Sequence, residues 1–276
     1  MASQTLSAPG GAMRSSAPIR ARKSSFFADL WSVAIRALRA LPREPEMVIP
    51  SLIIPVFFFA VNIGSLEAFA QRGIPGLDFR DFQLPTAIIF AVTGVSRANA
   101  LVIDIQSGYF DRMLMTPMRR LSLLLGLMIA DLALVMALSL PVLGLGFAVG
   151  VRFETGLLGV LVFILLAGLW ALAFTGFPYA IALKTGSPGA VGASFILFFP
   201  FAFLTTATLP LEALTGWLAD IARFNPMTYL LAALRSLLYG GWEARPLLEG
   251  ALAIVIVGTI SMAMALATLR GRVARG

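Results

Sequence analysis

The residue types that carry most enzymatic and metal chemistry are missing from this sequence. It contains no Cys and no His, so it offers no thiolate nucleophile, no Ser-His-Asp triad and no His or Cys ligand for zinc. It also contains no Gly-x-x-x-x-Gly-Lys-Ser/Thr loop, and Lys23 and Lys184 are its only lysines. We therefore assign no catalytic residue and no metal site, and we expect that this chain is not an enzyme.

Three polar residues lie within long apolar stretches: Arg97, Asn99 and Asp131. A charged side chain inside a membrane costs at least about 2.5 kcal/mol and usually faces a partner or a water-filled cavity. One interpretation places the three residues along a substrate path. The other, which we favour, pairs Arg97 with Asp131 between neighbouring helices, because Asp131 comes early in a long apolar stretch where pairing costs little.

A short mixed segment, residues 104–120, separates two of the apolar stretches. Gly108 and Pro117 bound its central part and favour a turn at each end. Its apolar residues cannot all share one face of a helix, since they include Tyr109, Phe110, Met113, Leu114 and Met115. Such an element suits contact with a protein on one side and with the bilayer on the other.

The composition indicates what must position these residues. Hydrophobic residues make up 59% of the 276 residues and charged residues only 13%, about half the charged share of a soluble domain. The sequence therefore predicts an integral membrane protein. The net charge of +7 does not indicate nucleic acid, because the basic residues lie at the ends of apolar segments rather than in a patch with aromatic side chains.

Six stretches reach the length of about 20 apolar residues that a transmembrane helix needs. They are residues 48–66, 84–103, 121–149, 156–183, 189–209 and 247–269. The segments on one side of these spans carry 14 Lys and Arg, whereas those on the other side carry six. Since basic residues concentrate on the cytoplasmic side, both termini are predicted to be cytoplasmic.

Two further segments precede the first span. Residues 1–25 are rich in Ser, Ala, Pro, Gly and Arg and are predicted to be disordered, although their composition also resembles an organellar transit peptide. Residues 26–46 predict an amphipathic helix with an apolar Phe, Trp and Leu face opposite an Arg-rich face. Such a helix suits the membrane interface, and packing on a soluble partner is the alternative.

The segment 210–245, between the last two spans, is too apolar for an ordinary loop. Breaks at Gly216, Asn225-Pro226 and Gly240-Gly241 predict two short helices joined at Asn225-Pro226. A hairpin that dips into the outer leaflet is one arrangement, because irregular backbone at that depth must be buried in protein. Two helices lying flat on the outer surface are the other.

The sequence resembles the membrane subunits of ABC-2 type exporters, particularly the permeases similar to the membrane component of the daunorubicin exporter, over roughly residues 26–270. One motif follows the second span, with matching residues Asp104, Ser107, Gly108, Phe110, Asp111, Arg112, Leu114, Pro117 and Arg120, then Gly126, Ala130 and Asp131. A second motif follows the fifth span, with matching residues Leu209, Pro210, Trp217, Leu218, Asn225, Pro226, Tyr229 and Arg235. The two motifs occur in the order expected for this family.

The resemblance implies an all-α integral membrane fold. It would comprise six transmembrane helices, an N-terminal amphipathic interfacial helix, a cytoplasmic coupling helix and an outer re-entrant helical hairpin. Together with the two tails that lie outside the resemblance, the predicted organisation is a tail (1–25), an interfacial helix (26–46), a transmembrane domain (47–270) and a basic C-terminal tail (271–276). The coupling helix would use Asp104, Gly108, Phe110, Asp111, Arg112, Leu114, Pro117 and Arg120, with Phe110 and Leu114 facing a partner, and the hairpin would use Trp217, Asn225, Pro226, Tyr229 and Arg235.

The resemblance also implies the partners. Two permeases, identical or related, would work in the inner (plasma) membrane with cytoplasmic ABC ATPase subunits, and ATP and Mg²⁺ would bind there and not to this chain. The expected function is export of an amphipathic drug, antibiotic, lipid or glycoconjugate. An ion-coupled secondary transporter is the alternative, but it generally needs carboxylates deep in the membrane and this chain offers mainly Asp131.

Small and aromatic residues in the third to fifth spans leave two interpretations open. They include Gly144, Gly146, Gly168, Gly176, Phe195, Phe198, Phe199 and Phe203. They could line a path for an amphipathic substrate. Close helix packing is the interpretation that we favour, because small residues allow helix backbones to approach each other in membranes.

Overall fold

The computed structural model describes residues 26–40, 45–73, 77–93, 96–115 and 120–273. All regular elements within these ranges are helical, which confirms the all-α prediction. The tail 1–25, Pro117 and the last three residues lie outside the described residues.

The helices follow the predicted order along the chain. They are α1 (Phe26–Ala40), α2 (Pro45–Gly73), α3 (Phe79–Thr93), α4 (Ala98–Gln106), α5 (Tyr109–Leu114), α6 (Arg120–Ala148), α7 (Gly156–Thr185), α8 (Pro188–Phe203), α9 (Gly216–Phe224), α10 (Pro226–Arg235) and α11 (Ala244–Val273). A 3₁₀ turn, η2 (Leu211–Ala213), precedes α9, and a π-helical turn, η3 (Ser236–Gly240), follows α10.

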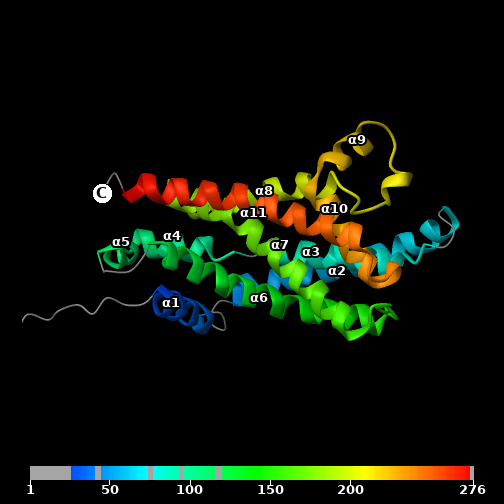
Figure 1. Cartoon of the computed structure of the whole chain (residues 1–276), viewed down its shortest axis with the longest axis horizontal. Helices are drawn as coiled ribbons and strands as arrows, with labels where there is room; N and C mark the ends of the chain where they lie inside the picture. The colour runs from blue at the N-terminus through cyan, green and yellow to red at the C-terminus, as the bar shows by residue number, and fades with distance from the viewer. Residues whose placement is uncertain (1–25, 41–44, 74–76, 94–95, 116–119, 274–276) are drawn as a thin grey trace, which may run out of the picture.

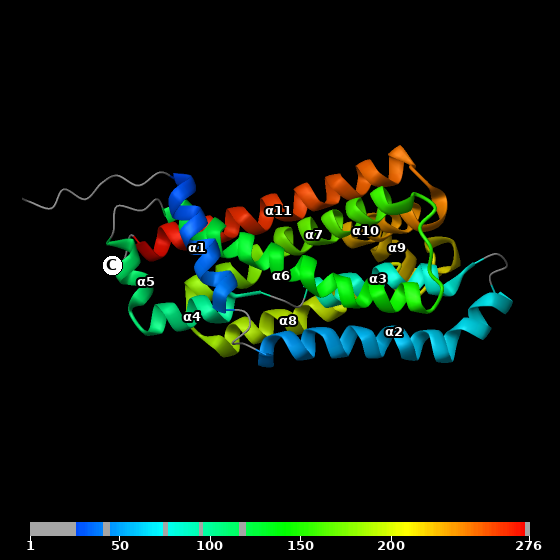
Figure 2. The ribbon, with the colours of Figure 1, turned by 90° about the horizontal axis from the view of Figure 1, so that it is seen from below.

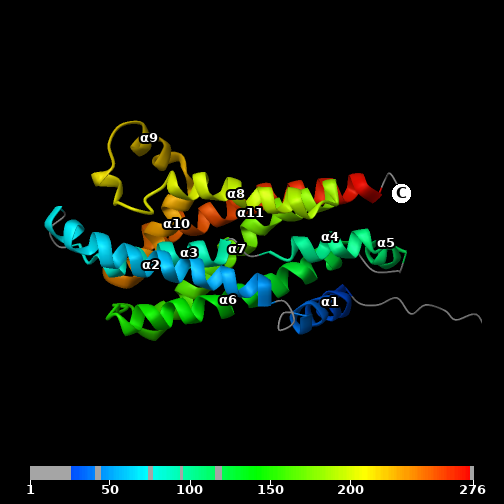
Figure 3. The same ribbon diagram turned by 180° about the vertical axis from the view of Figure 1, so that it is seen from behind.

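The long helices form an elongated bundle with two distinct ends (Figures 1 and 3). One end, which we call the α5 end, carries α1, α4, α5 and the C-terminal end of α11. The opposite end, which we call the hairpin end, carries α9, α10 and the beginning of α11. This arrangement places the amphipathic helix, the mixed loop and the C-terminal end of the last helix together, as the basic-residue count predicts.

Helix α7 lies at the centre of the bundle and packs against α3, α4, α6, α8 and α11. Three of its aromatic side chains, those of Phe163, Trp170 and Tyr179, are fully buried. Helix α2 lies at the periphery, and few of its residues are buried within the chain. Exposed apolar residues on α2, such as Ile53 and Phe57, therefore face the surroundings of the bundle.

Five candidate spans among the described residues are long and apolar enough to cross a membrane. The predicted fifth span, 189–209, is only partly helical, because α8 ends at Phe203 after 16 residues. At 1.5 Å per residue, α8 is about 24 Å long, shorter than a hydrocarbon core of about 30 Å. The apolar run continues to Leu209 in sequence, but residues 204–209 form turns that pack beneath the hairpin.

The predicted second span, 84–103, consists of two helices, because the chain breaks between α3 and α4. Apolar length alone did not reveal this break, although the sequence around it, Thr93-Gly-Val-Ser-Arg97, contains a glycine and three polar residues. The described residues on either side, Thr93 and Ser96, are buried. A helix interrupted at membrane depth needs partners for its polar groups, and these partners form part of the candidate site.

Helix α1 crosses the bundle at the α5 end and packs on α6 (Figure 2). Val33 and Ala34 are buried, whereas Trp31 remains 62% exposed. Gly126 allows the close approach, because a Cβ atom there would lie 2.7 Å from the Val33 Cβ and 2.9 Å from the Leu30 carbonyl oxygen. The amphipathic helix is therefore attached to the bundle by one face and exposes its Trp on the outside.

Four glycines on α6 and α7, Gly144, Gly146, Gly168 and Gly176, could line a path or allow close helix packing, and three of them occupy close helix contacts. A Cβ atom at Gly146 would lie 2.8 Å from Leu84, at Gly168 2.9 Å from Leu132, and at Gly176 2.6 Å from the backbone of Ser261. Nothing lies within 4 Å at Gly144. These contacts favour the packing interpretation for Gly146, Gly168 and Gly176.

Candidate functional site

Helix α5 begins after a sharp turn at Gly108. The glycine has φ +70°, a left-handed conformation that residues with a side chain rarely adopt. Its backbone nitrogen donates to the Ile105 carbonyl, and its own carbonyl accepts from the backbone nitrogen of Arg112 at 3.2 Å. The turn therefore ends α4 and starts α5 at a fixed angle, as the sequence predicts for Gly108.

Arg36 on α1 joins α1 to this turn. Its guanidinium lies 3.1 Å from the Asp104 carboxylate on α4 and 5.0 Å from the centre of the Tyr109 ring on α5. One arginine thus contacts both helices of the α4–α5 corner. Because the pair is partly exposed, its contribution to stability is small, about 1 kcal/mol or less, and its main effect is to fix orientation.

Phe110 points into the bundle, which corrects the expectation that it faces a partner. Its side chain is 1% exposed and belongs to an apolar cluster with Val33, Leu124 and Leu183. Phe110 therefore holds α5 on its own chain. The structure does not describe the side chains of Asp111, Leu114 and Arg120, so the roles expected for these residues stay predictions.

The face of α5 that remains open is formed by other residues. Tyr109 is 36% exposed and Arg112 is exposed as well, and Met115, which directly follows α5, is 79% exposed. At the base of the corner, the Gln106 side-chain amide donates to the Gly186 carbonyl at 2.9 Å, which ties α4 to the turn after α7. The helix that carries the open face is therefore held in place by contacts that involve α1, α4 and the turn after α7.

Arg97 and Asp131 meet at the break between α3 and α4. The Arg97 backbone nitrogen donates to one Asp131 carboxylate oxygen at 3.1 Å, and the Tyr179 hydroxyl donates to the other at 2.7 Å. Arg97, Asp131 and Tyr179 are all buried. The Arg97 backbone thus contacts Asp131, whereas the pairing of the Arg97 side chain with Asp131 that we favoured stays a prediction. Asn99 is exposed.

Tyr179 is the member of this cluster that sequence reasoning missed. The sequence around a Tyr in an apolar helix does not indicate which residue its hydroxyl contacts, and Tyr179 is 48 residues from Asp131 in the chain. A second contact lies nearby, where the Trp170 ring nitrogen donates to the Thr93 hydroxyl at 3.1 Å. Both donors lie on α7, so the central helix supplies one partner to α6, at Asp131, and one to the end of α3, at Thr93.

Replacing Tyr179 with Phe is expected to lower the free energy of unfolding by about 1 to 3 kcal/mol, because one oxygen of a buried carboxylate loses its donor. The measurement is thermal unfolding in detergent. Tyr229→Phe is the matched control, since the Tyr229 hydroxyl donates to the Arg223 carbonyl in an exposed position and its loss should cost less than about 1 kcal/mol. Equal losses of stability in the two variants would contradict the structural role of Tyr179.

The hairpin end is organised around Asn225 and Pro226, where α9 ends and α10 begins. The Asn225 side-chain oxygen accepts from the backbone nitrogen of Met227, as an N-cap does. Its amide nitrogen donates to the carbonyls of Phe201 and Leu204. The two predicted short helices and their junction are therefore confirmed, and Asn225 also ties them to the end of α8. Trp217 lies on the open side of α9 and is 68% exposed.

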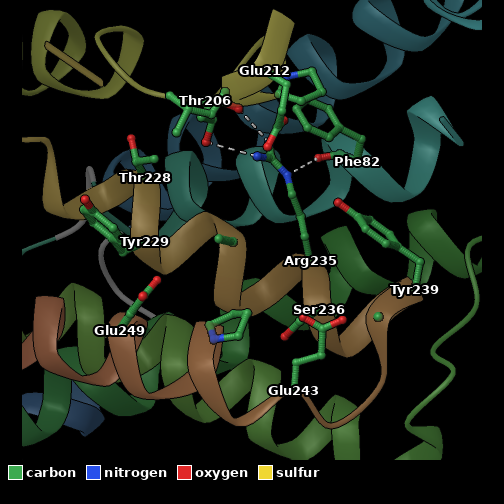
Figure 4. Close-up of a pocket in the computed structure, with 15 residues that line it drawn as sticks. Phe82, Thr206, Glu212, Thr228, Tyr229, Arg235, Ser236, Tyr239, Glu243 and Glu249 are labelled. Atoms are coloured by element: carbon green, nitrogen blue, oxygen red, sulfur yellow. Dashed lines mark hydrogen bonds between the residues drawn. The ribbon is translucent and has the colours of Figure 1, made fainter. Parts of the chain in front are cut away.

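Arg235 is the most extensively bonded residue of the hairpin. Its guanidinium donates to the Phe82 carbonyl at 3.1 Å, to the Thr206 hydroxyl at 3.1 Å, to the Thr206 carbonyl at 2.8 Å and to the Thr86 hydroxyl at 3.2 Å. It also stacks 3.5 Å from the centre of the Phe82 ring. Burial lowers the pKa of Arg235 to about 9, so the group remains charged at neutral pH. It joins α10 to α3 and to the turns after α8 (Figure 4).

Comparison with known protein families gives a match over most of the chain. The family model described as ABC-2 type transporter matches residues 28–239, which is well over half of the chain. The chain belongs to the ABC-2 type transporter family. The matched range includes α5, the polar cluster and the hairpin.

The curated relatives of this ABC-2 permease are transport permeases. It is 29% identical over 224 residues to a daunorubicin resistance ABC transporter permease protein of Streptomyces coeruleorubidus, covering 79% of this chain and 76% of that protein. It is 26% identical to a probable doxorubicin resistance ABC transporter permease protein of Mycobacterium tuberculosis, covering 77% and 78%. A putative transport permease of Cyanophora paradoxa is 24% identical, covering 77% and 74%. The chain is therefore a multi-pass membrane permease.

Proposed function

We propose that this ABC-2 permease is the transmembrane subunit of an ATP-driven exporter that moves an amphipathic drug, antibiotic, lipid or glycoconjugate out of the cytoplasm. ABC-2 permeases work with an ATP-binding subunit, and this sequence has no phosphate-binding loop of its own. ATP and Mg²⁺ would therefore bind the partner ATPase. The drug-resistance permeases among its relatives support export of an amphipathic compound.

The observation that carries the proposal is the open face of α5. A moving partner must push on a rigid element, because a loose loop would absorb the motion. The buried Phe110 and the fixed turn at Gly108 hold α5 to the bundle. Tyr109, Arg112 and Met115 are left open for the partner, and α5 is thus the proposed coupling helix.

The membrane orientation follows from the same assignment. With α5 on the cytoplasmic side, α1 lies at the inner interface, and both termini are cytoplasmic in the inner (plasma) membrane. The 14 basic residues on this side and six on the other support this orientation. The hairpin end then faces outward, where α9 and α10 would form a re-entrant plug.

A second copy of the permease, or a related one, would complete the exporter. The exposed apolar residues of α2 supply a surface for a neighbouring helix or for lipid. The ion-coupled alternative is weakened by the polar cluster, since both oxygens of Asp131 accept hydrogen bonds. A carboxylate held in this way is poorly suited to bind and release a transported ion.

Replacing Met115 with Asp is expected to reduce co-purification of the ATPase subunit about tenfold, because a charge at a contact surface must be desolvated. Met115 is 79% exposed, so the permease itself should fold and insert normally. The measurement is the ratio of ATPase to permease after affinity purification, together with ATP-dependent transport in vesicles.

Gly271→Asp is the matched control for this experiment. It adds the same charge on α11 at the α5 end, and nothing lies within 4 Å of a Cβ atom there. Its co-purification ratio should stay within about twofold of the wild type, since a surface substitution away from the contact has little effect. Normal assembly and transport in the Met115→Asp variant would exclude α5 as the coupling element.

A further inference from the structure

A cavity of about 530 Å³ opens beneath the hairpin, between α10, the start of α11 and the turns after α8. This volume falls in the range of small-molecule sites, about 300 to 1,000 Å³. Figure 4 shows the side chains that reach it from these elements and from α3. Its ionisable lining residues are Glu212, Tyr229, Arg235, Tyr239, Glu243 and Glu249.

The charge balance of the lining is negative. The lining carries three carboxylates, those of Glu212, Glu243 and Glu249, against one cation, Arg235. In the described part of the chain, the Arg235 nitrogens donate only to neutral oxygens, those of Phe82, Thr86 and Thr206. Glu249 accepts from Arg245 at 2.9 Å. Among the described residues, neither Glu212 nor Glu243 makes an ion pair, and these two carboxylates leave negative charge for a cation to neutralise.

A buried hydroxyl in the same lining also lacks a partner. Thr228 is only 6% exposed, and its hydroxyl oxygen makes no hydrogen bond to any of the residues that the structure describes. A buried polar group left without a partner costs about 1 to 3 kcal/mol. Thr228 is one of the residues that line the cavity, so the unsatisfied hydroxyl lies in the cavity wall.

The lining favours an organic cation over a metal ion. No group of three acidic residues within the described ranges is placed to hold a metal. The lining instead combines carboxylates with the aromatic side chains of Tyr229 and Tyr239, and aromatic faces attract organic ammonium groups. Tyr239 is 45% exposed, so its ring is accessible from the cavity.

We propose that this cavity binds an organic cation attached to an apolar body, with Glu212 and Glu243 balancing its charge and the Thr228 hydroxyl contacting its polar part. The ligand would be either a soluble cationic amphiphile or the ammonium headgroup of a phospholipid. The assignment rests on the proposed function only in placing the cavity on the outer side, because binding itself needs no ATPase.

The test uses the full-length permease purified alone in dodecyl maltoside. The probe is rhodamine 6G, a cationic aromatic dye, and its binding is followed by fluorescence anisotropy. Wild-type protein should bind rhodamine 6G at least about tenfold more tightly than the Glu212→Gln/Glu243→Gln variant, since two carboxylates are neutralised. Thr228→Val, which removes the hydroxyl and keeps the shape, should weaken binding about two- to fivefold.

Asp220→Asn is the matched control. Asp220 is an exposed carboxylate on α9 that is absent from the cavity lining, so its neutralisation should change the affinity less than about twofold. Binding by the double Gln variant within twofold of the wild type would overturn the proposal. Equally tight binding of the anionic dye fluorescein to the wild type would overturn it as well.

Added lipid distinguishes the two sources of the cation. If phosphatidylethanolamine weakens rhodamine 6G binding to the wild type and phosphatidylglycerol does not, the site accepts a lipid headgroup. If neither lipid competes while the Glu variants still lose binding, the site accepts a soluble amphiphile. Because the ATPase is absent, these results do not depend on whether the permease is an exporter.

Discussion

Replacing Arg235 with Leu is expected to lower the free energy of unfolding by about 3 kcal/mol or more. The substitution removes donors from the carbonyls of Phe82 and Thr206 and from the hydroxyls of Thr86 and Thr206. Buried oxygens left without a donor cost about 1 to 3 kcal/mol each, and the costs are not fully additive. The measurement is thermal or urea unfolding of the purified permease in detergent.

Arg223→Leu is the control for this prediction. Arg223 is on α9, its side chain is 64% exposed, and its nearest carboxylate, Asp220, is 4.0 Å away. Its loss should change stability by no more than about 0.5 kcal/mol. Arg235→Lys should fall between the two, because an ammonium keeps the charge but cannot reproduce the planar fork of the guanidinium. Similar stability of Arg235→Leu and Arg223→Leu would show that the Arg235 contacts do not hold the hairpin.

Replacing Gly176 with Ala is expected to destabilise the contact between α7 and α11 by about 2 to 3 kcal/mol, a large cost for one methyl group. The added Cβ atom would lie 2.6 Å from the Ser261 backbone carbon and 2.5 Å from its hydroxyl oxygen. That hydroxyl donates to the Ala173 carbonyl, so the side chain cannot move away freely. The helices must therefore separate or the hydrogen bond must break.

Gly144→Ala on α6 provides the comparison, because nothing lies within 4 Å of its Cβ position. Ala favours a helix over Gly by about 1 kcal/mol, so this control should be neutral or stabilising. Thermal unfolding of both variants in the same detergent is the measurement. A neutral result for Gly176→Ala would mean that α7 and α11 are less closely packed than the structure shows.

The elements that could be predicted from the sequence are those marked by local chemistry. Apolar length located α2, α6, α7 and α11, and the junction at Asn225 and Pro226 was marked by a residue that caps helices and one that cannot continue them. Gly108 similarly marked the start of α5. These signals depend on neighbouring residues alone, so they can be recognised without knowledge of the fold.

The features that were missed depend on contacts between distant segments. Polar residues lie at both interruptions, Thr205 and Thr206 after α8 and Ser96 and Arg97 before α4. Their partners are distant in the chain, because Thr206 contacts Arg235 and Arg97 contacts Asp131. Phe110 looks like an exposed anchor on a short amphipathic helix, but it is buried in a cluster that includes residues of α1, α6 and α7. Tyr179 and Arg235 likewise acquire their roles from partners that are far away in the chain.

The most direct test of the central proposal is to ask which end of the permease contacts the ATPase. The sequence contains no Cys, so Met115→Cys and Trp217→Cys each carry a single thiol for a benzophenone photocrosslinker. Both positions are well exposed, at 79% and 68%. Met115 directly follows α5 and Trp217 lies on α9, and these two helices are at opposite ends of the bundle (Figure 1). Irradiation of the assembled transporter is predicted to join the Met115→Cys variant to the ATPase subunit and to leave the Trp217→Cys variant uncoupled. A crosslink from Trp217→Cys, or none from Met115→Cys while the ATPase still co-purifies, would contradict the account.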